Sequence, residues 1–210
     1  MIIEKTKDMN ILILSGSPRR DGNTDLLVEA FVKGASQKHH VEVVSVHDYK
    51  VNPCIGCNAC FKAAFEREKN QACLNSSEHE QSRPRVKSEG NVCAQKDDMH
   101  HIYEKASEAD MLVIASPVYF YGLSAQLKSI IDRFHNPIRD TFHIKKMALL
   151  LVGAATLPEL FDSILAEYQL CLNFFKLEDA GKVLARGCKD KGEINHSGYL
   201  DEALKLGATI

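Results

Sequence analysis

The chain has 210 residues, 45% of them hydrophobic and 26% charged, with a formal net charge of -2. This length fits one domain with an inserted segment, and the composition excludes collagen-like, coiled-coil and disordered chains. Because Lys and Arg do not outnumber Asp and Glu, we expect no nucleic-acid partner. The longest apolar run, residues 147–152, is too short to cross a bilayer, so no membrane partner is expected either. The N-terminus lacks the apolar stretch of a signal peptide, which favours a cytoplasmic protein with reduced thiols.

The first third of the chain alternates strand, helix and strand. Residues 11–14 are apolar without interruption, which is typical of a strand buried on both faces of a parallel sheet. Apolar residues at helical spacing then predict a helix over residues 24–38. A second strand is expected over residues 41–46.

The alternation continues in the C-terminal half. The pattern predicts strands over 111–115, 147–152 and about 177–185, and helices over 99–106, 123–134, from 160 onwards and over 200–207. Five strands alternating with five helices indicate a doubly wound α/β domain with right-handed crossovers. About fifty residues separate the second strand from the next helix, where two to six are usual. We therefore expect one domain over residues 1–210, with a polar surface insertion at 61–92.

The loop after the first strand has the composition of an anion site. Small residues would let the backbone approach a phosphate, the hydroxyls of Ser15, Ser17 and Thr24 can donate to it, and the following helix begins there. Arg19 would add a positive charge. The loop lacks the lysine of a Walker motif, the glycine spacing of a dinucleotide fingerprint and the cysteine of a low-molecular-weight phosphatase. A capped turn that binds nothing is the alternative.

The loop after the third strand carries three consecutive aromatic residues between Pro117 and Gly122. Such a stiff, apolar shelf suits a flat heteroaromatic ring, and its backbone amides could bond the polar edge of that ring. Any one of these aromatic side chains could instead belong to the core or to a subunit contact.

These two loops together closely resemble the NAD(P)H-dependent FMN reductase branch of the flavodoxin-like superfamily. The resemblance rests on Gly16-Ser17-Pro18-Arg19 with Gly22-Asn23-Thr24, and on Ser116-Pro117-Val118-Tyr119 with Gly122. It runs from about residue 10 to residue 133, is interrupted by the insertion, and continues more weakly to the C-terminus. It implies a flavodoxin-like sheet in the order 2-1-3-4-5, with helices on both faces.

The resemblance also implies non-covalent FMN and assigns its contacts by matched position. The phosphate would be held by the first loop: Ser15, Ser17, Pro18, Arg19, Asn23 and Thr24. The isoalloxazine ring would be lined by Pro117, Val118, Tyr119, Phe120 and Gly122, with Gly153 in a small-residue loop at its pyrimidine edge. The implied activity is hydride transfer from NADH or NADPH to FMN. The reduced flavin would then pass electrons to a quinone, a nitro or azo compound or free flavin. The family also implies a homodimer or homotetramer, and no side chain is required as a general base.

Five of the seven cysteines lie between Cys54 and Cys93. The run Cys54, Cys57 and Cys60 has the spacing of iron–sulfur ligands and resembles that of the iron–sulfur flavoproteins, which are relatives within the same superfamily. Those proteins place a fourth cysteine a few residues further on, whereas here Cys73 and Cys93 lie much farther along the chain. A zinc site, buried reduced thiols and a 4Fe-4S electron carrier are therefore kept as alternatives, and no metal ligand is assigned.

Overall fold

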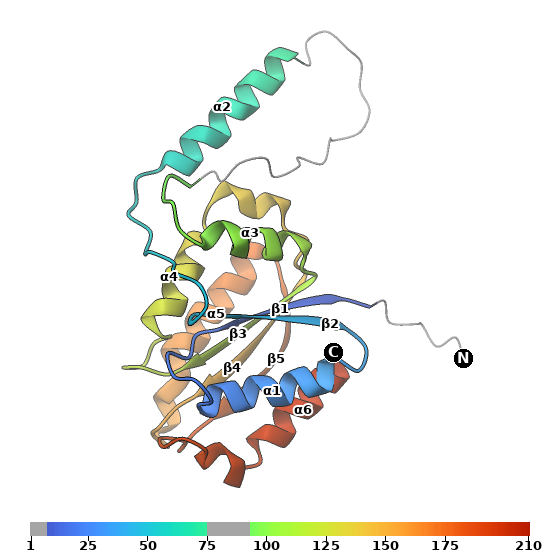
Figure 1. Cartoon of the computed structure of the whole chain (residues 1–210), viewed down its shortest axis with the longest axis vertical. Coiled ribbons are helices and arrows are strands. Elements are labelled where there is room, and N and C mark those ends of the chain that lie inside the picture. Colours follow the sequence, from blue (N-terminus) through green and yellow to red (C-terminus); the bar gives the residue numbers. More distant parts are fainter. Residues whose placement is uncertain (1–7, 75–92) are drawn as a thin grey trace, which may run out of the picture.

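Residues 8–74 and 93–210 are described by a computed structural model, in which five parallel strands form one sheet (Figure 1). The strands are β1 (Asn10–Ser15), β2 (His40–Ser45), β3 (Met111–Pro117), β4 (Lys146–Val152) and β5 (Glu178–Ala185). Their order across the sheet is β2-β1-β3-β4-β5, and every neighbouring pair is parallel. The predicted flavodoxin-like order is confirmed.

Two layers of helices cover the sheet. On one face lie α1 (Asn23–Ala35) and α6 (Tyr199–Thr209), and on the other lie α3 (Met99–Glu108), α4 (Ala125–Arg133) and α5 (Asp162–Phe175) (Figure 1). Each layer encloses its own cluster of buried apolar residues. Alternate residues of β1 serve the two clusters, since Ile11 and Ile13 face α1 while Leu12 and Leu14 face the other layer.

Burial along the strands follows their position in the sheet. β1, β3 and β4 are central and almost completely buried, which explains their uninterrupted apolar sequences. The edge strands β2 and β5 mix exposed and buried residues. Within the two described ranges, no helix combines the length and the apolar character needed to cross a membrane.

The predicted elements are all present, with small differences at their ends. α1 ends at Ala35, three residues before the predicted end, and α4 begins at Ala125. α5 begins at Asp162 and is preceded by the 3-10 helix η3 (Pro158–Phe161). Two more 3-10 helices, η2 (Pro137–Thr141) and η4 (Glu193–His196), lie in connections.

One helix was not predicted. α2 (Ala59–Leu74) begins within the cysteine segment and projects beyond the two-layer body (Figure 1). Its sequence has no apolar stripe at helical spacing, since residues 66–71 are all polar. The aromatic residues Phe61 and Phe65 near its start are exposed. Residues 61–74 of the predicted insertion belong to this helix, whereas residues 75–92 lie outside the described residues.

α1 and α6 approach each other through glycines. A Cβ atom on Gly34 would lie 2.1 Å from the carbonyl oxygen of Leu204, and one on Gly207 would lie 2.2 Å from that of Phe31. Both obstacles are backbone atoms, so a side chain at either position would force the helices apart.

We predict that Gly34→Ala lowers the free energy of unfolding by about 1–3 kcal/mol or more, because the added methyl group cannot fit without moving α6. Chemical denaturation measures the change. Gly198→Ala is the matched control, because its Cβ would have no neighbour within 4 Å. Equal stability of the two variants would contradict the close packing of α1 on α6.

Candidate functional site

The loop after β1 turns sharply into α1. The Gly16 amide donates to the Ala115 carbonyl over 2.8 Å, which continues the pairing of β1 with β3. The Ser17 hydroxyl donates to the Arg19 carbonyl over 2.7 Å and accepts from the Arg19 amide over 3.3 Å. Ser17 therefore shapes this loop, while the Arg19 side chain is exposed to solvent.

Ser15, the last residue of β1, carries an unsatisfied hydroxyl. The residue is 2% exposed, and its Oγ has no hydrogen-bond partner among the described residues. Leaving a buried hydroxyl unpaired costs about 1–3 kcal/mol, so such groups usually meet a ligand or an ordered water. Ser17 and Thr24 are also almost completely buried and lie in the same turn.

The amino end of α1 opens onto this loop. Gly22 precedes the helix, and its amide donates to the Asp25 carboxylate over 3.1 Å. Burial raises the pKa of the Asp25 carboxyl, and the nearby charge of Asp21 acts in the same direction.

Asn23 connects this loop to a distant segment. Its side-chain Nδ2 donates to the carbonyls of Cys188 (3.2 Å) and Asp190 (2.8 Å). Its Oδ1 accepts from the amides of Gly192 (2.9 Å) and Ile194 (3.5 Å). Because this amide is fully engaged within the protein, a ligand could meet Asn23 only through its backbone N–H group.

The segment held by Asn23 brings a lysine to the first loop. Lys191 Nζ lies 3.4 Å from Asp21 Oδ2 and donates to the Arg20 carbonyl over 3.5 Å. No local sequence pattern points to Lys191, because its position depends on a contact between segments about 170 residues apart. The cations Arg19 and Lys191 thus lie on an exposed rim of the same turn.

Three aromatic residues follow β3 in a tight turn. The amides of Tyr119 and Gly122 donate to each other's carbonyls over 3.0 and 3.1 Å. Phe120 and Tyr121 between them have φ angles of 49° and 64°, which side-chain-bearing residues adopt rarely. The Ser163 hydroxyl donates to the Tyr121 carbonyl and holds the turn from α5. The turn presents Phe120, which is 98% exposed, to solvent.

The loops after β1, β3 and β4 meet at one edge of the sheet, because parallel strands end there together. A Cβ on Gly16 would lie 2.7 Å from Ser124 Oγ at the start of α4, so the first loop packs directly against the segment after β3. Gly153 continues β4 by donating to the Ala185 carbonyl over 2.8 Å. Pro117 and Val118 are half-buried at the same edge. These loops therefore lie at the switch point between β1 and β3, which is where open α/β sheets bind their ligands.

The cysteine segment does not form a metal site as it stands. Cys54 and Cys57 are exposed, Cys60 is half-buried in the first turn of α2, and the side chain of Cys73 lies outside the described residues. Among the residues that are described, no three His, Cys, Asp or Glu side chains are grouped closely enough to hold a metal ion. Burial raises the pKa of the Cys60 thiol, and negative charge on Cys93 and Cys57 acts in the same direction.

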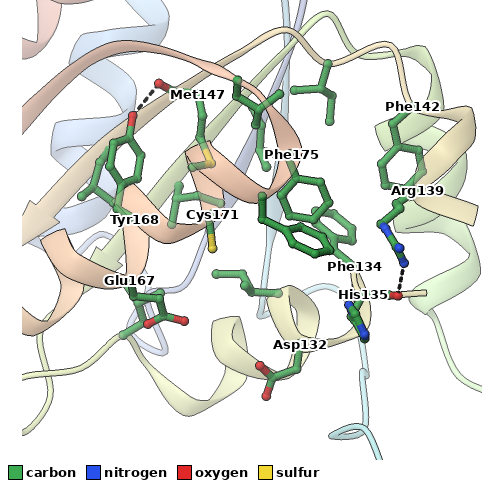
Figure 2. A pocket seen from close by; sticks show the side chains of 18 of the residues that line it. Asp132, Phe134, His135, Arg139, Phe142, Met147, Glu167, Tyr168, Cys171 and Phe175 are labelled. Atoms are coloured by element: carbon green, nitrogen blue, oxygen red, sulfur yellow. Dashed lines mark hydrogen bonds between the residues drawn. The ribbon is translucent and has the colours of Figure 1, made fainter. Parts of the chain in front are cut away.

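An apolar cavity lies away from this edge. An apolar cavity of about 330 Å³ opens between α4, η2 and α5 and reaches β3 and β4. Figure 2 shows Phe134, Phe142 and Phe175 around it, with the Cys171 thiol in its wall. The predicted site residues do not line this cavity.

Known proteins with sequences similar to this chain belong to FMN-dependent families, as the resemblance of the two loops implies. A model of the family described as NADPH-dependent FMN reductase matches residues 9–175. An iron–sulfur flavoprotein of Methanocaldococcus jannaschii is 38% identical over 150 residues, or 70% of this chain and 63% of that protein. The Bacillus subtilis protein YwqN, named as an NAD(P)H-dependent FMN-containing oxidoreductase, is 23% identical over 85% of this chain and 86% of that one.

Solved structures share the fold. The NAD(P)H:quinone oxidoreductase of Methanothermobacter marburgensis superposes with a TM-score of 0.64 at 19% identity, over 97% of both chains. The matches to the iron–sulfur flavoproteins cover less of those proteins. They span 63% of the Methanocaldococcus protein and 48% of one from Archaeoglobus fulgidus.

Proposed function

Because the chain belongs to the NADPH-dependent FMN reductase family, we propose that it is an FMN-dependent oxidoreductase supplied by NADH or NADPH. The electrons would pass to a small-molecule acceptor such as a quinone, a nitro or azo compound or free flavin. The observation that carries this proposal is the buried, partnerless hydroxyl of Ser15 beside the amino end of α1. The reaction would take its electrons from NADH or NADPH in the cytoplasm, so the proposal includes a cytoplasmic location.

The described residues fit FMN. Ser15 and Thr24, with the amino end of α1, would bind its phosphate, while Arg19 and Lys191 would add positive charge at the rim. The turn at Tyr119–Gly122 would support the ring. When bound, FMN would supply the hydride-accepting chemistry, and the protein would contribute binding, orientation and exclusion of water.

The side chains of Ser17 and Asn23, which the resemblance assigns to FMN, would support the site through contacts within the protein. The Ser17 hydroxyl fixes the turn, and the Asn23 amide holds the segment that carries Lys191. No side chain is needed to abstract a proton, because hydride transfer to a flavin requires none.

We expect Ser15→Ala to raise the Kd for FMN by roughly 10- to 100-fold, because the hydroxyl would donate to a charged phosphate. The Kd for riboflavin, which lacks the phosphate, should change little. Fluorescence titration measures both ligands, and Ser107→Ala is the control, since that hydroxyl donates to the Glu104 carbonyl on the surface of α3. An equal loss for FMN and riboflavin would contradict phosphate recognition by Ser15.

The activity itself is tested by anaerobic absorbance spectroscopy of the FMN-loaded protein. We predict that NADH, NADPH or both bleach the flavin band within seconds, and that an added quinone restores it. The same titration with protein that lacks FMN is the blank. A flavin band that neither nucleotide bleaches would reject the reductase proposal.

A second candidate function is an electron carrier that uses FMN and a cysteine-ligated iron–sulfur cluster. The observation that favours it is the run Cys54, Cys57 and Cys60 in a chain that is 38% identical over 150 residues to an iron–sulfur flavoprotein. In the arrangement described, Cys54 and Cys57 would have to move toward Cys60 and Cys93 to share a centre with them. Iron and acid-labile sulfide near cluster stoichiometry in anaerobically purified protein would support this candidate, and their absence would reject it.

Self-association is part of the proposal. Leu170 and Phe174 on α5 are 68% and 56% exposed, and Phe174 lines the cavity between α4 and α5. A twofold interface needs projections and hollows on the same face of each copy, and this face has both.

We therefore predict that Phe174→Glu reduces the mass measured by light scattering to that of one chain, because a carboxylate would be buried against the apolar cavity of the second copy. Val43→Glu on β2, at the opposite edge of the sheet from β5, is the matched control. An unchanged mass for Phe174→Glu would exclude this face as the interface.

A further inference from the structure

The apolar cavity between α4, η2 and α5 is apart from the loops at the switch point and has a volume of about 330 Å³. The sheet forms its floor, where Leu112 of β3 and Met147 and Leu149 of β4 are almost completely buried. Protein cores are packed as closely as organic crystals and rarely leave voids larger than a water molecule. Small-molecule pockets, in contrast, span about 300–1,000 Å³. This cavity therefore has room for a small organic ligand.

The wall of the cavity at the end of α4 is held in place by a buried ion pair. Arg133, the last residue of α4, pairs with Asp97, and their side chains are 2% and 4% exposed. Arg133 Nη1 donates to the Asn52 carbonyl over 3.2 Å, and the Asn52 amide donates to the Asp97 carboxylate over 2.8 Å. The Arg133 carbonyl accepts from the Tyr103 hydroxyl over 2.9 Å. Phe134 of the cavity wall follows directly, so this wall is preformed, as ligand pockets usually are.

Aromatic side chains give the cavity its shape. The Phe134 and Phe142 rings pack edge to face with centroids 5.6 Å apart, and the Phe174 and Phe175 rings do so at 4.9 Å. The Cys171 thiol lies in the same wall (Figure 2). Burial raises the pKa of this thiol, so the sulfur stays neutral. Such walls favour a flat, apolar ring.

The charged groups around the cavity differ in how well they are paired. The Asp132 and Glu167 carboxylates share Lys128, whose Nζ lies 3.6 Å from Glu167 Oε1. The Arg139 side chain, which is 20% exposed, lies on the opposite side of the cavity from Glu167 (Figure 2). Its Nε is 3.8 Å from a carboxylate oxygen of Asp140, which is 78% exposed, so water screens this pair. The positive charge of Arg139 is therefore only weakly neutralised.

The Arg139 guanidinium keeps donors available for a ligand. Among the residues that the structure describes, its hydrogen bonding is limited to Nη1, which donates to the His135 carbonyl. The guanidinium carbon lies 5.4 Å from the centroid of the Phe174 ring, so the cation is held beside the aromatic wall. A guanidinium offers a planar set of donors that matches the two oxygens of a carboxylate. The polar group that best complements this side of the cavity is therefore an acid group.

We propose that this cavity binds a small aromatic carboxylate, with its ring between the phenylalanine side chains and its acid group against Arg139. The inference does not depend on the proposed function, because the residues assigned to FMN do not line this cavity. Protein that failed to bind FMN would still be expected to bind such a ligand.

The first test is calorimetric titration of the full chain, with FMN in excess, using two probes of the same shape. 2-Naphthoate carries a carboxylate, whereas 2-naphthamide is neutral. We expect naphthoate to bind about tenfold more tightly than naphthamide, and Arg139→Gln to remove that difference. Lys33→Gln, on α1 in the opposite helical layer, also removes one positive charge and should leave both affinities unchanged.

The second test shows where the probe binds. Saturating naphthoate should slow the alkylation of Cys171 by iodoacetamide several-fold, as measured by peptide mass mapping, because this thiol lies in the cavity wall. The exposed thiols of Cys54 and Cys57 are controls within the same sample and should react at an unchanged rate. This measurement uses the unaltered chain, so it does not depend on the folding of a variant.

Several results would overturn the proposal. Equal affinity of the unaltered protein for the two probes would exclude recognition of the acid group, as would a preference for naphthoate that persists in Arg139→Gln. Equal protection of Cys54, Cys57 and Cys171 would place the probe outside the cavity. A cavity filled by a side chain of a second copy would leave both probes unbound, and that result would also reject the ligand site.

Discussion

The close approach of the first loop to the start of α4 is the constraint on which the candidate site depends. Gly16 has no side chain, and any Cβ there would collide with Ser124 Oγ and with Leu127. This contact sets the loop after β1 directly beside the segment after β3, and it buries Ser15 beneath them. The loop after β1 and the aromatic turn after β3 share one edge of the sheet because their parallel strands end there, and the missing side chain at Gly16 lets the first loop pack directly against the start of α4.

The fold was predictable because its elements bury apolar faces with regular spacing. The inner residues of β1 and β4 are all apolar because helices cover both faces of the sheet there, and α1 carries its apolar residues at helical spacing. The sequence did not reveal α2, because residues 66–71 are all polar and no apolar spacing near 3.6 residues continues through them. Near its amino end, α2 contacts the rest of the protein: the centroid of the Phe61 ring lies 5.4 Å from that of the His135 ring.

The candidate site was predictable as a pair of loops but not in its details. Residue types placed Ser15 at the end of β1 and Thr24 at the start of the following helix, yet nothing in the sequence shows which way a side chain turns. The Asn23 amide turns toward the segment at 188–194, and that choice also sets the position of Lys191. Contacts between segments so far apart in the chain follow from tertiary packing, which no local pattern encodes.

The hydrogen bonds that join the two ends of the segment containing α2 affect how this chain can change during evolution. Asn52 and Asp97 are bonded to each other and to Arg133, so the sheet and its register do not depend on how many residues lie between them. Each doubling of a flexible loop costs only about 0.6 kcal/mol of closure entropy. Residues can therefore be gained or lost in this stretch with little effect on the stability of the domain, and a lineage could lengthen it without rebuilding the site at the switch point.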